Sequence, residues 1–273
     1  MIRAFYNSAA GMVAQQKSID MISNNIANIN TIGYKKEKAS FKDNLYTVME
    51  RRPRDVNLQV GSGSRVGATQ RYFHQGAPES TGRSLDVAIY GPGFIKAQGR
   101  GDDVVYTRDG SLQLSSETDQ LGSVFRLTTS SGYYVLDEQT GNPISFRPYY
   151  PQQNITFSQE NVLISEEGDV SILDEYQNAY QIGKISVVSF ANPEGLESIG
   201  DNIYKAPEIN DSIAGEEIAD YESKLMQGYI ERSNVDLGKE MIELIMSQRA
   251  YQLSARVLQS ADEMERLAND LRN

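Results

Sequence analysis

The two ends of the chain carry the strongest structural constraint, because each repeats mostly apolar residues at alternating spacings of three and four. The N-terminal pattern runs through Phe5, Ser8, Met12, Gln15, Ile19, Ile22, Ile26 and Ile29. Such spacing is the seam of a heptad helix. Asn30, Thr31 and Gly33 then form a plausible helix stop. The sequence therefore predicts a long N-terminal helix of modest apolar content, which needs a partner to be stable.

The C-terminal end mirrors this pattern. Its seam runs through Leu237, Met241, Leu244, Gln248, Tyr251, Ala255 and Leu258, then continues after one slip in register through Ala261, Met264, Ala268 and Leu271. No Pro or Gly interrupts residues 239–273, so we expect one helix of roughly nine turns. Ser233 and Asn234 are candidate caps, with Asp236 in the first turn. The two helices could pair with each other or with helices of neighbouring copies.

The middle of the chain has the features of an antiparallel β domain, with turn signals about every ten residues. Residues 104–114 hold the strongest short hairpin signal, with Asp109-Gly110 at the turn. Residues 162–173 predict a second hairpin around Glu166-Glu167-Gly168-Asp169. We therefore predict an α+β protein with a coiled-coil-like helical domain (1–34 and 231–273), a connector (35–71) and a central antiparallel β domain (72–230).

Charge supports this division. Residues 1–55 carry a net charge of +4, residues 56–230 carry −13 and residues 231–273 carry −2. The total of −11 disfavours nucleic acid as the main partner, because binding phosphates needs a surplus of basic charge. The basic run from Lys35 to Arg54 is interpreted as a solvated connector, or as one that pairs with acidic surfaces of other copies.

No residue constellation typical of an enzyme is visible. The chain has no cysteine and one histidine, His74, which leaves little chemistry for a thiolate or histidine metal site. Glu166, Glu167 and Asp169 lack the ligand spacing of a calcium loop and fit a solvated turn. Arg100-Gly101-Asp102 is a tripeptide that some adhesion receptors bind, so a surface adhesin is a less favoured alternative. We predict no catalytic residues, cofactor or metal, and neither a membrane span nor a Sec-type signal peptide is expected.

A group of asparagines lies at the end of the predicted N-terminal helix. Asn24, Asn25, Asn28 and Asn30 alternate there with apolar seam residues. Buried amides in a helical interface cost stability but fix register and partner choice. An ordinary polar helix end explains the pattern equally well, so periodicity alone leaves both interpretations open.

Motifs at both ends and in the middle resemble the bacterial flagellar rod and hook proteins. At the N-terminus these motifs are Ala10-Gly11-Met12-Val13-Ala14-Gln15-Gln16 and Ser23-Asn24-Asn25-Ile26-Ala27-Asn28-Ile29-Asn30-Thr31-Ile32-Gly33-Tyr34-Lys35. At the C-terminus they are Glu231-Arg232-Ser233-Asn234-Val235-Asp236, Gln248-Arg249-Ala250-Tyr251-Gln252 and Asp262-Glu263-Met264. In the middle they are Leu85-Asp86-Val87-Ala88-Ile89, Gly91-Pro92-Gly93-Phe94 and Tyr106-Thr107-Arg108-Asp109-Gly110. The length and the central motifs look most like the distal-rod members, with proximal-rod or hook-type members as alternatives.

The resemblance implies a structural subunit of the basal-body rod that polymerises helically into a hollow shaft outside the cytoplasmic membrane. It implies as partners copies of the chain, other rod and hook proteins, ring proteins and the flagellar type III export apparatus. The expected assembly residues are the seam positions and three asparagines, namely Met12, Ile19, Ile22, Asn24, Asn25, Ile26, Asn28, Leu237, Met241, Leu244, Gln248, Tyr251 and Leu258. We also expect the chain ends to be poorly ordered before assembly.

Overall fold

The computed structural model divides the chain into two compact units. The helical unit comprises Met1–Asn28, Lys36–Tyr72 and Val235–Asn273, and the β unit comprises Ile29–Lys35 and Phe73–Asn234. The described residues are 2–45, 47–49, 58–99, 101, 103–119, 122–150, 155–156, 158–174, 178–207, 218–219 and 223–271. The α+β class with helices at both ends is as expected from the sequence.

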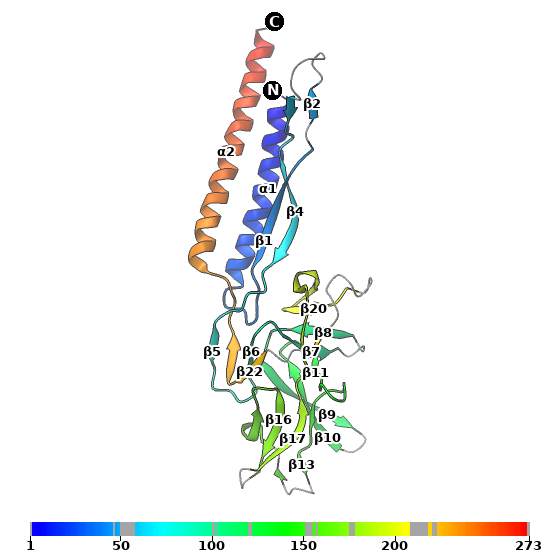
Figure 1. The fold of residues 1–273 in the computed structure, drawn as a ribbon. Helices are drawn as coiled ribbons and strands as arrows, with labels where there is room; N and C mark the ends of the chain where they lie inside the picture. The colour runs from blue at the N-terminus through cyan, green and yellow to red at the C-terminus, as the bar shows by residue number, and fades with distance from the viewer. Residues whose placement is uncertain are drawn as a thin grey trace. The chain divides into compact units, whose positions relative to one another are not determined.

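Two helices and a β-hairpin build the helical unit. Helix α1 (Ile2–Ala27) lies between helix α2 (Leu237–Asp270) on one side and strands β1 and β4 on the other (Figure 1). Because α1 ends at Ala27, Ile29 of the predicted seam lies outside the helix, in the β unit.

The N-terminus of α2 differs from the prediction by two residues. Asp236 is the cap, and its side chain accepts a hydrogen bond from the backbone N–H of Lys239 at 3.2 Å. The Asn234 side chain instead donates to the backbone carbonyl of His74 at 3.0 Å. The predicted Ser233-Asn234 cap is therefore wrong, because Asn234 is engaged in the β unit.

The segment expected to be a connector, 35–71, contains regular structure over much of its length. Strand β1 (Glu37–Asp43) pairs antiparallel with β4 (Ser64–Arg71), with a bulge between Ser40 and Phe41. Strands β2 (Thr47–Met49) and β3 (Leu58–Val60) pair further along the same hairpin. Packing on α1 compensates for the weak strand pattern of this segment. Residues 50–54, at the end of the basic run that starts at Lys35, lie outside the described residues.

The β unit consists of antiparallel sheets. The largest has the order β12-β10-β11-β7-β8-β20-β19, with β9 added on β10, β18 on β7 and β21 on β18. Its strands are β7 (Phe94–Gln98), β8 (Val104–Thr107), β9 (Leu112–Asp119), β10 (Gly122–Thr129), β11 (Tyr134–Val135), β12 (Ser145–Phe146), β18 (Val187–Ser189), β19 (Glu197–Gly200), β20 (Ile203–Lys205) and β21 (Ile218–Ala219).

Smaller sheets complete this unit. They are β15 (Val162–Ile164) with β16 (Asp169–Leu173) and β17 (Ala179–Lys184), β22 (Lys224–Gln227) with β6 (Val87–Tyr90), β23 (Tyr229–Glu231) with β5 (Pro78–Ser80), and β13 (Tyr149–Tyr150) with β14 (Ile155–Thr156). Two short 3-10 helices, η1 (Gln159–Asn161) and η2 (Pro193–Gly195), lie between strands. Strands β22 and β23 directly precede α2 in the sequence, so the last two strands of the β unit come from the C-terminal part of the chain.

A large apolar core holds the β unit together. Its fully buried members include Leu85, Val87, Ile95, Leu127 and Phe146. A second cluster is aromatic, and in it the Phe94 ring packs edge-to-face on Phe190 and Tyr204 at centroid distances of 5.9 Å. Burial of this extent is the main favourable term in folding.

One predicted hairpin of the β unit is confirmed and the other is wrong. Strands β15 and β16 pair across the Glu166–Asp169 turn as expected. Strands β8 and β9, on either side of Asp109-Gly110, pair with other strands instead. Asp109 is buried and bonds to the Ser111 amide and the Ser130 hydroxyl, and burial raises the pKa of its carboxyl. The dipeptide therefore forms a buried corner rather than an exposed two-residue turn.

Candidate assembly interface

Small and polar side chains form the contact line between α1 and α2, which we call the inner stripe. Its three pairs, spaced seven residues apart on each helix, are Gly11 with Ser254, Ser18 with Ser247, and Asn25 with Glu240. A Cβ atom at Gly11 would lie 3.6 Å from the Ser254 hydroxyl, and the two serine hydroxyls are 3.5 Å apart. The pairing order makes the helices antiparallel.

Asn25 ties three elements of the helical unit together. Its side-chain amide donates to the Glu37 carbonyl at 2.8 Å and accepts from the Glu37 amide at 3.0 Å, which mimics a strand partner for β1. The same amide donates to Glu240 of α2 at 3.2 Å, and Lys36 forms an ion pair with that carboxylate. Asn25 and Glu240 are both buried. This buried hydrogen-bond network therefore fixes α1, β1 and α2 in one register.

The other two predicted asparagines act locally. The Asn28 side chain donates to the Asn24 carbonyl at 3.0 Å and to its side-chain oxygen at 2.6 Å. Asn24 is exposed and Asn28 is half-buried. The structure thus places Asn25 in the helix interface and the other two at the helix end.

The predicted apolar seams flank the inner stripe. On α1, Ile22 is buried, while Met12, Ile19 and Ile26 are half-buried. On α2, the half-buried predicted residues are Leu244 and Leu258, and the exposed ones are Leu237, Met241, Gln248 and Tyr251. Their role in assembly remains a prediction.

Helix α2 also carries an exposed apolar stripe, which we call the outer seam and of which the sequence analysis named Met264 alone. Its members are Met246, Leu253, Val257, Met264 and Leu267, and each is between 50% and 65% exposed. Ala250 and Ser260 fill the gaps, so the spacing alternates between four and three over residues 246–267. Met246 and Leu253 directly precede the stripe residues Ser247 and Ser254, roughly 100° around the helix.

The outer seam therefore lies on the flank of the inner stripe opposite to residues 237–258 of the predicted C-terminal seam, and it shares Met264 with the part of that seam after the slip. A contiguous apolar stripe of this kind marks an interaction site in a soluble protein. Full burial of each large apolar side chain contributes about 1.5–3 kcal/mol relative to exposure. Exposed apolar side chains at this spacing suit contact with a further helix.

The structure places several of the features that the sequence analysis considered for other activities. Among the described residues, no group of His, Asp and Glu has metal-site geometry. His74 is exposed, and its carbonyl accepts from the Lys35 ammonium at 2.9 Å. Glu166 and Glu167 are exposed in their turn, as expected. Arg100 and Asp102 of the adhesion-type tripeptide lie outside the described residues.

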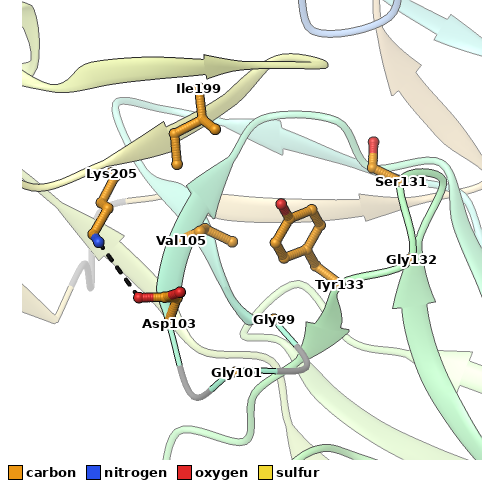
Figure 2. Close-up of a pocket in the computed structure, with 9 residues that line it drawn as sticks. All are labelled: Gly99, Gly101, Asp103, Val105, Ser131, Gly132, Tyr133, Ile199 and Lys205. Carbon is orange, nitrogen blue, oxygen red and sulfur yellow. Dashed lines mark hydrogen bonds and ion pairs between the residues drawn. The ribbon is translucent and has the colours of Figure 1, made fainter.

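The β unit contains a hollow of about 460 Å³ on one face of its main sheet (Figure 2). Tyr133 and Ile199 form parts of its wall, Val105 lies at its floor, and Lys205 pairs with Asp103 at 3.4 Å. The lining also includes Ser131, and the polar contact drawn in it is the Lys205–Asp103 ion pair.

Neither helix of the described chain is both long and apolar enough to cross a membrane. Three family models match the sequence in consecutive parts. They are described as flagella basal body rod protein (residues 5–35), flagellar hook protein FlgE/F/G D1 domain (88–172) and flagellar basal body rod FlgEFG protein C-terminal (226–271).

Full-length relatives agree with these models. The flagellar basal-body rod protein FlgG of Borreliella burgdorferi is 38% identical, over 100% of this chain and 99% of its own length. FlgG of Caulobacter vibrioides is 35% identical over the whole of both chains. The flagellar hook-basal body complex protein FlhP of Bacillus subtilis is 31% identical, also over both full lengths.

Proposed function

The chain belongs to the family of flagellar basal-body rod proteins, and on this premise we propose that it is a structural subunit of the basal-body rod without enzymatic activity. Copies polymerise helically into a hollow shaft that transmits torque and passes exported subunits. Its neighbours are copies of itself and other rod and hook proteins, with ring proteins outside and the type III export apparatus as its route out of the cell.

The outer seam of α2 is the observation that carries this proposal. Its five apolar side chains repeat with heptad spacing, yet α1 does not cover them. A helix with two apolar flanks and a polar inner stripe can pack in coiled-coil fashion against more than one further helix. In the polymer, the predicted seam and the outer seam each bury against helices of neighbouring copies.

The distal part of the rod is the position that we favour. The FlgG relatives match along their entire length, with no large insertion in the middle, and the chain retains the central motifs that resemble distal-rod members. The relative named as a hook-basal body complex protein, at 31% identity, supports a proximal or hook-type position as the alternative. Cross-linking in purified basal bodies, followed by mass spectrometry of the linked peptides, distinguishes these positions by the identity of the neighbours.

Replacement of one outer-seam residue tests the assembly role. Cells that carry only a Leu253→Asp chain should lack complete rods and be non-motile, because a carboxylate cannot be buried in an apolar helix contact. Gln252→Asp is the matched control, since the neighbouring position is already exposed and polar. Electron microscopy of isolated basal bodies and a motility assay provide the readouts. Normal rods with Leu253→Asp would contradict the proposal.

A further inference from the structure

A buried charge cluster in the β unit joins segments from both ends of the chain. Glu231 of β23 lies at its centre, with Lys35 from the N-terminal side and Arg108 from the middle of the chain. All three side chains are at most 1% exposed. Such groups are buried only when their charges and hydrogen bonds are compensated.

The Glu231 carboxylate satisfies donors from three segments. One oxygen accepts from the Lys35 ammonium at 2.6 Å and from the Gly76 amide at 2.7 Å. The other accepts from Arg108 Nε at 3.0 Å. The Glu231 backbone carbonyl also accepts from the Gly33 amide at 2.8 Å, so this one residue holds the N-terminal segment 33–35 by both its side chain and its backbone.

Two glycines allow this close approach. Gly33 has φ +69°, and a Cβ there would lie 3.0 Å from the Arg108 backbone. A Cβ at Gly76 would lie 1.9 Å from the Arg232 carbonyl oxygen. The backbone segments around the cluster are therefore packed too closely for a side chain at either glycine.

The cluster holds two basic side chains, Lys35 and Arg108, and one carboxylate, Glu231. Arg108 is fixed by the β unit itself, because its guanidinium donates to the Gly91 carbonyl at 2.7 Å and stacks over the Phe94 ring at 5.5 Å. Docking of Lys35 brings a second cation beside it. Burial, followed by the Arg108 charge, lowers the pKa of Lys35 to about 8, while Glu231 acts in the opposite direction. Without Glu231 the site would hold two cations and no anion.

We propose that Glu231 is a conditional latch, through which the C-terminal strand of the β unit permits residues 33–35 of the N-terminal segment to dock. Strand β23, which precedes α2, thus controls whether residues 33–35, which follow α1, can dock. Until β22 and β23 pair with β6 and β5, Arg108 repels Lys35 from the closed site. The N-terminal segment therefore docks last, after the C-terminal strands of the β unit have paired, and this order does not depend on the function proposed above.

Hydrogen exchange of the full-length chain, measured by mass spectrometry, tests the latch. In Glu231→Gln, which keeps the shape of the side chain but removes its charge, the peptide 29–36 should exchange at least about tenfold faster than in the wild type. The peptide 162–173, which spans β15 and β16, should keep its protection. Glu79→Gln is the matched control, since Glu79 lies in the paired strand β5 and forms an exposed ion pair with Arg232 at 3.1 Å.

The double variant Lys35→Met/Glu231→Gln separates charge conflict from simple damage. It holds one cation instead of two, so protection of peptide 29–36 should return toward the wild-type value. If Glu231→Gln does not fold, folding of the double variant would support the same conclusion. Wild-type protection in Glu231→Gln, equal loss of protection in both peptides, or no recovery in the double variant would each overturn the proposal.

Discussion

The two units of the molecule bury their side chains in opposite ways. The β unit encloses a large apolar core around Phe146 and Leu127. Among the described residues of the helical unit, the buried apolar side chains are Ala14, Ile22, Val235 and Ala261, and its inner stripe is small or polar. The β unit thus buries its large apolar side chains within the chain, whereas the helical unit leaves most of its own exposed or half-buried.

The strongest test of this difference compares one buried and one exposed apolar residue. Phe146→Ala should lower the free energy of unfolding of the β unit by about 3–5 kcal/mol, because it leaves a cavity in a closed core. Met246→Ala in the outer seam should change the stability of the isolated chain by less than about 0.5 kcal/mol. Urea denaturation of both variants provides the measurement. Similar losses in the two variants would remove the distinction between the units.

A second test uses the depressed pKa of Lys35. The folded-state pKa is about 8 and the ordinary value is 10.5, so between these pH values the unfolded chain binds more protons. Stability should therefore rise with pH across this window, by up to about 3 kcal/mol. The rise should be smaller in Lys35→Met, as followed by chemical denaturation at several pH values. Identical pH dependence of stability in the wild type and in Lys35→Met would mean that the lowered pKa of Lys35 is not the cause of the rise.

The stability of the helical unit should fall most when the hydrogen-bond network of Asn25 is lost. Asn25→Ala removes the side-chain partners of the Glu37 backbone and should cost about 1–3 kcal/mol. Asn24→Ala, at an exposed position one residue away, should have little effect. Thermal melting followed by circular dichroism at 222 nm distinguishes the two. Equal melting temperatures would mean that Asn25 does not hold the helices together.

The smallest expected effect is at the start of α2. Asp236→Ala removes the side-chain acceptor of the Lys239 amide, so the first turn should fray and helicity should fall slightly. Asp262→Ala, within the helix and exposed, is the control and should leave the first turn intact. Hydrogen exchange of the peptide 235–245 resolves this difference. Unchanged protection of this peptide after Asp236→Ala would mean that the Asp236 side chain does not stabilise the first turn of α2.

Local patterns predicted the elements whose contacts are local. The three-four spacing gave both helices, and the Glu166–Asp169 turn gave the β15–β16 hairpin. The Asp109-Gly110 signal failed because burial of Asp109 and long-range pairing of β8 and β9 override the turn preference. The hairpin at 37–71 was missed because packing on α1 outweighs its weak strand pattern.

The candidate site was only partly predictable for the same reason. Periodicity indicates which helical positions are apolar, but α2 has apolar residues on two flanks, and only the position of α1 reveals which of them stay exposed. Consecutive lysines 35 and 36 reach buried glutamates 231 and 240 in different units. Pairs separated by about two hundred residues leave no local signal. The expectation of poorly ordered ends before assembly stays a prediction.

One measurement tests the central claim, that the outer seam is reserved for other subunits. The chain has no cysteine, so Leu253→Cys introduces a single thiol into the seam. We predict rapid labelling by a maleimide in the monomer, protection in isolated basal bodies, and full labelling after those basal bodies are dissociated. Equal labelling of the monomer and of intact basal bodies would mean that the outer seam stays exposed in the rod, which would contradict this account.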